Sequence, residues 1–218
     1  MKKKLFSLTI SLLIALTLLG FSLIAFLPKY FLFEKFVAPA GLFILSGGVE
    51  ENVNTLQYTD GFIAYGGKRI ANFTLMEISL LPLPGGKLLC PSGGYTEINF
   101  SPPQRVDITI DSFDCSPYIG NAQGSLKVLR HEIYGDITLL GVRLENAPIR
   151  EIEKIKLHFV GKTFTGTVRA MGALFTGGGN IKWDLFHPDR GYIDATFRGN
   201  GVVITLRGTL ENPLIEVR

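Results

Sequence analysis

The chain has 218 residues, of which 46% are hydrophobic and 25 are glycine, and its formal net charge is +3 at pH 7. Lys2, Lys3 and Lys4 account for that excess, because the other 19 basic residues are matched by 19 acidic ones. A nucleic-acid-binding protein carries a basic stripe. No such run is present, so the charge argues against a polyanionic partner.

The longest apolar segment is Leu5–Leu27, in which 23 residues contain neither charge nor proline. As a helix it would be roughly 35 Å long, enough to cross a bilayer core of about 30 Å. The three lysines before it predict that residues 1–4 form a cytoplasmic tail. The sequence therefore predicts a single N-terminal transmembrane helix, with everything from about Tyr30 onward across the membrane.

A cleaved signal peptide is the alternative interpretation of this segment. Signal peptides normally have an apolar region of 7 to 15 residues followed by a small-residue cleavage site. Here the apolar run is longer, and Pro28, Lys29 and Tyr30 follow it directly. We therefore expect an uncleaved anchor, followed by an interfacial linker over residues 28–40, where aromatic residues are frequent.

From residue 41 onward the dominant sequence period is two. The apolar segment 41–47 is expected to be a first strand, and Val106, Ile108 and Ile110 then alternate with polar residues. Such alternation is typical of strands in antiparallel sheets, which have one apolar and one wetter face. Glycine-containing pairs and triplets, which favour tight turns, lie between these runs, for example at 60–61, 66–67, 84–86, 120–121, 177–179 and 199–201.

These patterns predict one all-β domain over residues 41–218, expected to lie in the periplasm. About 190 residues outside the anchor suffice for one domain with its own core. We expect an antiparallel meander of about ten to twelve strands, forming a curved sheet or a partly open barrel. The best helical candidate after the anchor is residues 147–154, which would make one or two turns.

The apolar faces of several predicted strands are candidates for a groove or a core. A sheet buries its apolar face by closing as a barrel or sandwich, or it curves into a trough in which a lipid chain or a partner can lie. Trp183 fits a core position most simply, or else the wall of a groove. The residues expected at such positions are Ile155, Leu157, Phe159, Ile181, Trp183, Leu185, Val202, Ile204 and Leu206.

The two cysteines, Cys90 and Cys115, form an even count in a domain expected on the oxidising side of a membrane. That context favours a disulfide, although two free thiols are the alternative. A bridge would close a loop of about 25 residues, worth on the order of 3 kcal/mol in the chain-entropy model. The spacing does not fit the C-x-x-C motif of redox enzymes.

No motif in the sequence indicates catalysis. His131, His158 and His187 lack metal-binding spacing, and no nucleophile elbow is present. Asp107 and Asp111 share one strand face, which is more simply a solvated outer face than an acid–base pair. We therefore expect a protein without catalytic residues, metal or cofactor.

Four segments of the C-terminal half carry a family resemblance. They are residues 144–149, 152–159, 177–181 and 206–215, of which the last contains the pattern L-x-G-T-L-x-N-P-x-I. Together they resemble AsmA-like envelope proteins. The short length and single anchor are most similar to the type II secretion system protein N family, GspN. In architecture the resemblance covers residues 60–218.

The resemblance implies a non-enzymatic, single-pass inner-membrane protein whose periplasmic β domain is an accessory component of a type II protein secretion system. Its partners would be the membrane and other secretion-system proteins. Residues 214–217, a terminal strand, are a candidate to pair with another chain. The alternative is an AsmA-like lipid-binding or lipid-transfer module with an apolar groove.

Overall fold

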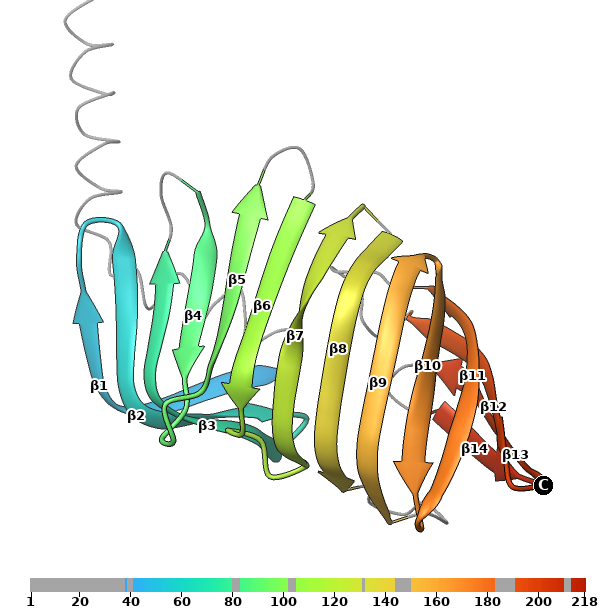
Figure 1. The fold of residues 1–218 in the computed structure, drawn as a ribbon. Helices are drawn as coiled ribbons and strands as arrows, with labels where there is room; N and C mark the ends of the chain where they lie inside the picture. The colour runs from blue at the N-terminus through green and yellow to red at the C-terminus, as the bar shows by residue number, and fades with distance from the viewer. Residues whose placement is uncertain are drawn as a thin grey trace, which may run out of the picture.

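A computed structural model describes residue 38 and residues 41–79, 83–101, 105–130, 132–143, 150–182, 191–209 and 213–218. These residues form one antiparallel sheet in which each strand is hydrogen-bonded to the next along the chain (Figure 1). The strands are β1 (Leu42–Glu51), β2 (Thr55–Tyr65), β3 (Lys68–Ser79), β4 (Gly85–Leu89), β5 (Tyr95–Ser101), β6 (Arg105–Phe113), β7 (Ile119–Leu129), β8 (Glu132–Arg143), β9 (Glu151–Gly161), β10 (Thr163–Ala170), β11 (Ala173–Lys182), β12 (Tyr192–Gly199), β13 (Val202–Thr209) and β14 (Pro213–Val217).

The all-β antiparallel meander is confirmed, and the sheet is curved and open. β1 and β14 are its two edges in the described residues, and they are not paired with each other. Figure 1 shows that β11 to β14 turn back behind β9 and β10. The structure is therefore a strongly curved sheet and not a closed barrel.

The described residues form fourteen strands, so the expected number of ten to twelve was too low. Gly85 and Gly86 begin β4, and Gly177–Gly179 lie inside β11, although both segments were predicted to be turns. Residues 60–61 and 120–121 likewise lie within β2 and β7. Glycine in a strand marks a bulge or a close approach of backbones, and at Gly179 an added Cβ would lie 2.5 Å from the Cα of Ala195.

The predicted helical turns at 147–154 are also wrong for the part that the structure describes, because residues 151–154 belong to β9. This segment pairs with β8, where Val142 is opposite Ile152 and Leu139 is opposite Ile155. Hydrogen bonds to β8 thus hold Ile152 and Ile155 in an extended backbone, although their spacing of three also suits a helix. Residues 147–149 lie outside the described residues.

Among the described residues, the core is divided into three clusters along the curved sheet. The largest joins strands that are distant in the sheet, since Val106 and Val128 of β6 and β7 belong to the same cluster as Phe197 and Ile204 of β12 and β13. A second cluster, around Leu56 and Phe73, lies on β2 and β3. The third surrounds the two cysteines.

The predicted transmembrane helix, residues 5–27, and its cytoplasmic tail lie outside the described residues, as does nearly all of the linker. Within the part of the chain that is described, no helix is long and apolar enough to cross a membrane.

Candidate functional site

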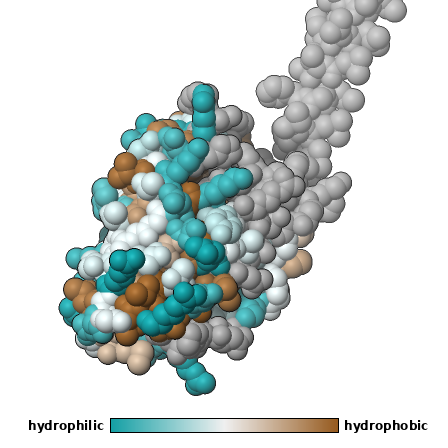
Figure 2. Space-filling model, turned by 90° about the vertical axis from the view of Figure 1, so that its right-hand side faces the viewer, coloured by the Kyte–Doolittle hydropathy of each residue, from teal (hydrophilic) through white to brown (hydrophobic). Residues whose placement is uncertain are grey.

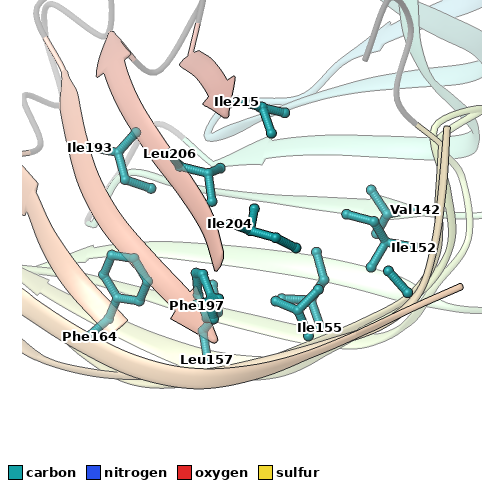
Figure 3. A pocket seen from close by; sticks show the side chains of 12 residues that line it. Val142, Ile152, Ile155, Leu157, Phe164, Ile193, Phe197, Ile204, Leu206 and Ile215 are labelled. Carbon is teal, nitrogen blue, oxygen red and sulfur yellow. The ribbon is translucent and has the colours of Figure 1, made fainter. Parts of the chain in front are cut away.

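The C-terminal half of the sheet encloses an apolar cavity of about 210 Å³ (Figure 3). Its lining comes from β8, β9 and β10 on one side and from β12, β13 and β14 on the other. Every lining residue is apolar. They are Val142, Ile152, Ile155, Leu157, Phe164, Val168, Ala170, Ile193, Phe197, Ile204, Leu206 and Ile215. We call this cavity the apolar trough.

The curvature of the sheet brings the two walls of the trough together. Figure 3 shows Ile155 and Leu157 of β9 pointing into the space below Ile204 and Leu206 of β13. Phe164 is buried at one end, where its ring centroid lies 5.6 Å from that of Phe159 and 6.4 Å from that of Phe197. Tilted aromatic contacts at these distances are favourable, so they fix this part of the wall.

Alternation from Ile155 to His158 explains why this part of the wall is apolar. Leu157 faces the trough, whereas Lys156 and His158 on either side of it are exposed on the outer face. There, Nδ1 of His158 lies 2.8 Å from Oδ1 of Asp136 on β8. Lys156 and His158 therefore lie on the face of the sheet away from the trough.

Four of the nine residues expected at a groove or core line the trough: Ile155, Leu157, Ile204 and Leu206. Phe159 is buried in the largest core cluster, and Ile181 and Val202 pack against that cluster. Trp183 and Leu185 lie outside the described residues.

The sequence reasoning missed the other eight lining residues. Phe164 and Val168 could have been found, because β10 alternates apolar and polar residues from Thr163 to Arg169. Ile193 and Phe197 could be assigned to the trough only from the strand register, which places Ile193 opposite Ile181 and Phe197 opposite Gly177.

The predicted disulfide between Cys90 and Cys115 is confirmed. The two Cα atoms are 5.1 Å apart, and both residues are buried with Ala71. The bridge joins the β4–β5 turn to the β6–β7 turn, and the backbone amide of Asn72 on β3 donates a hydrogen bond to the carbonyl oxygen of Cys115 at 2.9 Å. It thus connects three neighbouring parts of the sheet at one end.

The ionisable groups named in the sequence analysis do not reach the trough. Asp107 forms an ion pair with Arg105 at 2.7 Å, and Asp111 is exposed beside Ser112. His131 and His187 lie outside the described residues. Among the residues with described positions, no three His, Cys, Asp or Glu side chains are grouped so that they could hold a metal ion.

One ionisable group on the outer face has a shifted pKa. The hydroxyl of Tyr134 donates a hydrogen bond to Oε2 of Glu132 at 2.7 Å. This hydrogen bond, together with partial burial and the charge of the Glu132 carboxylate, raises the pKa of Tyr134. The pair lies outside the trough, whose lining carries no group for acid–base chemistry.

Among curated proteins, an uncharacterized protein of Aquifex aeolicus (strain VF5) is similar to this chain over most of both lengths. The two are 31% identical over 201 residues, which cover 92% of this chain and 90% of the Aquifex protein. No family model and no solved structure matches the chain.

Proposed function

We propose that this chain, which belongs to the same protein family as the Aquifex aeolicus protein, is a non-enzymatic lipid-binding module that holds an acyl chain in its apolar trough. The observation that carries the proposal is the composition of the lining, in which all twelve residues are apolar. Ligand sites are mostly apolar with a few polar groups that orient the ligand. A site without such groups suits a hydrocarbon chain.

The size of the trough supports the same ligand class. A protein cavity of roughly 150 Å³ lined by apolar side chains stays dry and binds benzene, and this one measures about 210 Å³. Along β10 the lining runs from Phe164 to Ala170, a length of roughly 20 Å at about 3.3 Å per residue. Each buried methylene contributes about 0.8 kcal/mol, so a short stretch of acyl chain binds measurably.

The position of charged residues favours a lipid head group that lies outside the trough. Lys156 and His158 of β9 are on the outer face of the sheet, and an ionised or strongly polar group inside the trough would lose its hydration without gaining a partner. The disulfide fits a domain in an oxidising compartment. We therefore also propose a single-pass anchor in the inner membrane and a domain in the periplasm.

Photolabelling of the full-length protein tests the proposal. The protein is reconstituted into bilayers that contain a phospholipid with a diazirine at the end of one acyl chain, and cross-linked peptides are identified by mass spectrometry. We expect labelled peptides from β9, β10 and β13. These peptides are distinct from any that the predicted span at 5–27 contributes.

Two variants make the experiment specific. Val168→Phe places a larger apolar side chain in the trough and should lower labelling of β9 and β13 several-fold while the fold is kept, as checked by thermal unfolding. Lys156→Asp changes charge on the outer face of β9 and should leave labelling unchanged. Labelling confined to residues 5–27, or equal labelling in Val168→Phe and the parent protein, would contradict the proposal.

A second candidate function is the accessory role in a type II secretion system that the family resemblance implies. The observation that favours it is β14, an edge of the described sheet on which Leu214 and Val217 are exposed. Edge strands accept another chain by β-augmentation. Co-purification of secretion-system proteins with the full-length chain, lost when Ile215 is replaced by proline, would support this role, whereas recovery of the chain alone would oppose it.

A further inference from the structure

Three basic side chains lie together on the face of the sheet away from the apolar trough. Lys154 of β9 is directly opposite Arg169 of β10, and two residues further along β9, Lys156 is opposite Thr167. Residues that are two apart on a strand, or directly opposite on the next strand, project from the same face of a sheet. We call Lys154, Lys156 and Arg169, together with Thr167, the basic cluster.

The neighbours in the sequence fix the direction in which the cluster points. Arg169 lies between two residues that line the trough, and so does Lys156. Because successive side chains of a strand point to opposite faces, both cations point outward, and both are exposed. Figure 2 shows the C-terminal side of the molecule, on which hydrophilic residues project among hydrophobic ones. The cluster is therefore open to solvent, with the wall of the trough between it and the trough.

The cluster differs from other basic positions of the sheet because no acidic residue is opposite it. The cross-strand neighbours of its three cations are apolar residues, threonines and each other: Leu140, Leu174, Thr138, Thr167 and the pair Lys154–Arg169. Elsewhere in the described sheet, several basic residues each have an acid directly opposite: Lys87 with Glu77 and Glu97, Lys127 with Asp107, Arg143 with Glu151, and Arg207 with Asp194. Like charges directly opposite each other are destabilising, so the cluster is an unfavourable arrangement as long as no anion is bound.

Acidic residues beside the cluster have other partners. Oε1 of Glu153 accepts a hydrogen bond from the backbone amide of Gly172 at 2.9 Å, and Oδ1 of Asp136 lies 2.8 Å from Nδ1 of His158. In the part of the chain that the structure describes, no ion pair joins an acid to any of the three cations. The charge of the cluster is therefore available to an anion from outside the sheet.

The spacing of the four side chains suits a single anion with several oxygen atoms. Directly opposite residues have Cβ atoms about 5 Å apart, and residues two apart on one strand are roughly 6.6 Å apart. Lysine and arginine side chains are long enough to meet above the middle of such a square. Arginine binds an oxyanion in a bidentate way, lysine binds it as a point charge, and a threonine hydroxyl donates one more hydrogen bond.

The number of cations selects the kind of anion. A carboxylate has one negative charge and two oxygen atoms, which leaves part of the cluster unmatched. A phosphate monoester has three acceptor oxygens and a charge of about −1.5 to −2 at pH 7. We propose that the basic cluster binds a phosphate group. The trough is on the other face of these strands, so the inference does not rest on the proposed function.

Calorimetric titration of inorganic phosphate into the full-length protein, in a phosphate-free non-ionic detergent at low ionic strength, tests the site. We expect one phosphate per chain, with binding at least tenfold weaker in Arg169→Gln and in Lys154→Gln. Lys127→Gln is the matched control, because it removes an exposed cation of the outer face that is opposite Asp107, and it should leave the affinity unchanged. Absence of saturable binding to the parent protein, or equal weakening in all three variants, would overturn the proposal.

Thermal unfolding separates a binding role from a structural one. Without phosphate, Arg169→Gln should be at least as stable as the parent protein, because it removes a contact between like charges. Phosphate at ten times its Kd should raise the unfolding midpoint of the parent protein by roughly 3 °C or more, and should raise that of Arg169→Gln and Lys154→Gln much less. A phosphate-dependent rise that persists in both variants would contradict the proposal.

The phosphate group has two sources, a soluble phosphate ester or a phospholipid head group, and a second ligand distinguishes them. Phosphatidic acid added to the same micelles identifies a head group if it raises the midpoint at a concentration at least tenfold below that of inorganic phosphate. A soluble ester is identified if inorganic phosphate alone is effective. Photolabelling of the trough reports on acyl chains only, so labelling without phosphate binding would refute this inference alone, and the converse would refute the proposed function alone.

Discussion

Gly166 on β10 and Gly177 on β11 lie directly opposite each other in the sheet. On their other sides, Gly166 is opposite Leu157 of β9, and Gly177 is opposite Phe197 of β12. A Cβ atom on Gly177 would overlap the carbonyl oxygen of Thr196 and lie 2.7 Å from the Cα of Phe197. Neighbouring strands therefore approach more closely here than a side chain would allow, at the place where Figure 1 shows the sheet turning back.

Gly177→Ala should destabilise the domain because β12 cannot keep its distance from β11 once a methyl group is present. Forcing an extra carbon into a packed site typically costs about 1–3 kcal/mol. The free energy of unfolding, measured by urea denaturation, should fall by this amount. Gly47→Ala is the control, since the nearest atom to its added Cβ would be 3.6 Å away and the site is exposed. Equal stability of the two variants would show that the close approach of the strands at Gly177 does not contribute to the stability of the domain.

Phe164→Ala should be among the more destabilising single substitutions. Its side chain is buried and contacts the rings of Phe159 and Phe197, and loss of a buried phenylalanine costs about 3–5 kcal/mol. The neighbouring Thr165→Ala changes an exposed side chain on the opposite face and should alter stability by no more than about 0.5 kcal/mol. Chemical denaturation of both variants checks the difference, and a small effect at Phe164 would mean that this part of the trough wall is loosely packed.

The sequence predicted the fold class because alternation is a local property. Val106, Ile108 and Ile110 repeat every second residue, and the structure places them on one strand, β6. The number of strands was underestimated because glycine is found both in tight turns and inside strands that approach each other closely. At Gly177–Gly179 it permits close packing of strands, although a run of three glycines taken alone favours a turn.

The composition of the trough was only partly predictable, since part of its lining depends on long-range register. Ile204 and Leu206 follow from alternation within β13, but their partners Phe197 and Ile215 are fixed by pairing with β12 and β14. Likewise, curvature decides whether Leu157 and Ile204 face each other, and no local pattern reports curvature.

Removal of the disulfide should lower stability without abolishing the sheet. Cys90 and Cys115 are 25 residues apart, and the chain-entropy model gives about 3 kcal/mol for a loop of this length. The double variant Cys90→Ala with Cys115→Ala should therefore unfold at lower urea concentration than the oxidised protein. Adding reductant should destabilise the parent protein and leave the double variant unaffected. No difference between the oxidised and reduced parent would show that the bridge contributes little.

The pair Tyr134–Glu132 predicts a loss of stability at alkaline pH. The hydrogen bond to Glu132, partial burial and the carboxylate charge all raise the pKa of Tyr134 in the folded protein, whereas in the unfolded chain it is about 10. Between these two pKa values the folded state binds more protons than the unfolded state, so the free energy of unfolding falls as pH rises through this window. Below the unfolded pKa the contribution is fully present.

Glu132→Gln should lower the pKa of Tyr134 toward its ordinary value, because an amide removes the negative charge and the strong acceptor. Spectrophotometric titration of the phenolate, with Tyr134→Phe subtracted to isolate this residue from the other six tyrosines, measures the change. Tyr134 should then lose its proton at nearly the same pH in the folded and unfolded states. The free energy of unfolding should therefore depend less strongly on pH in the alkaline range. An unchanged pKa of Tyr134 in Glu132→Gln would assign the shift to burial instead of to the carboxylate.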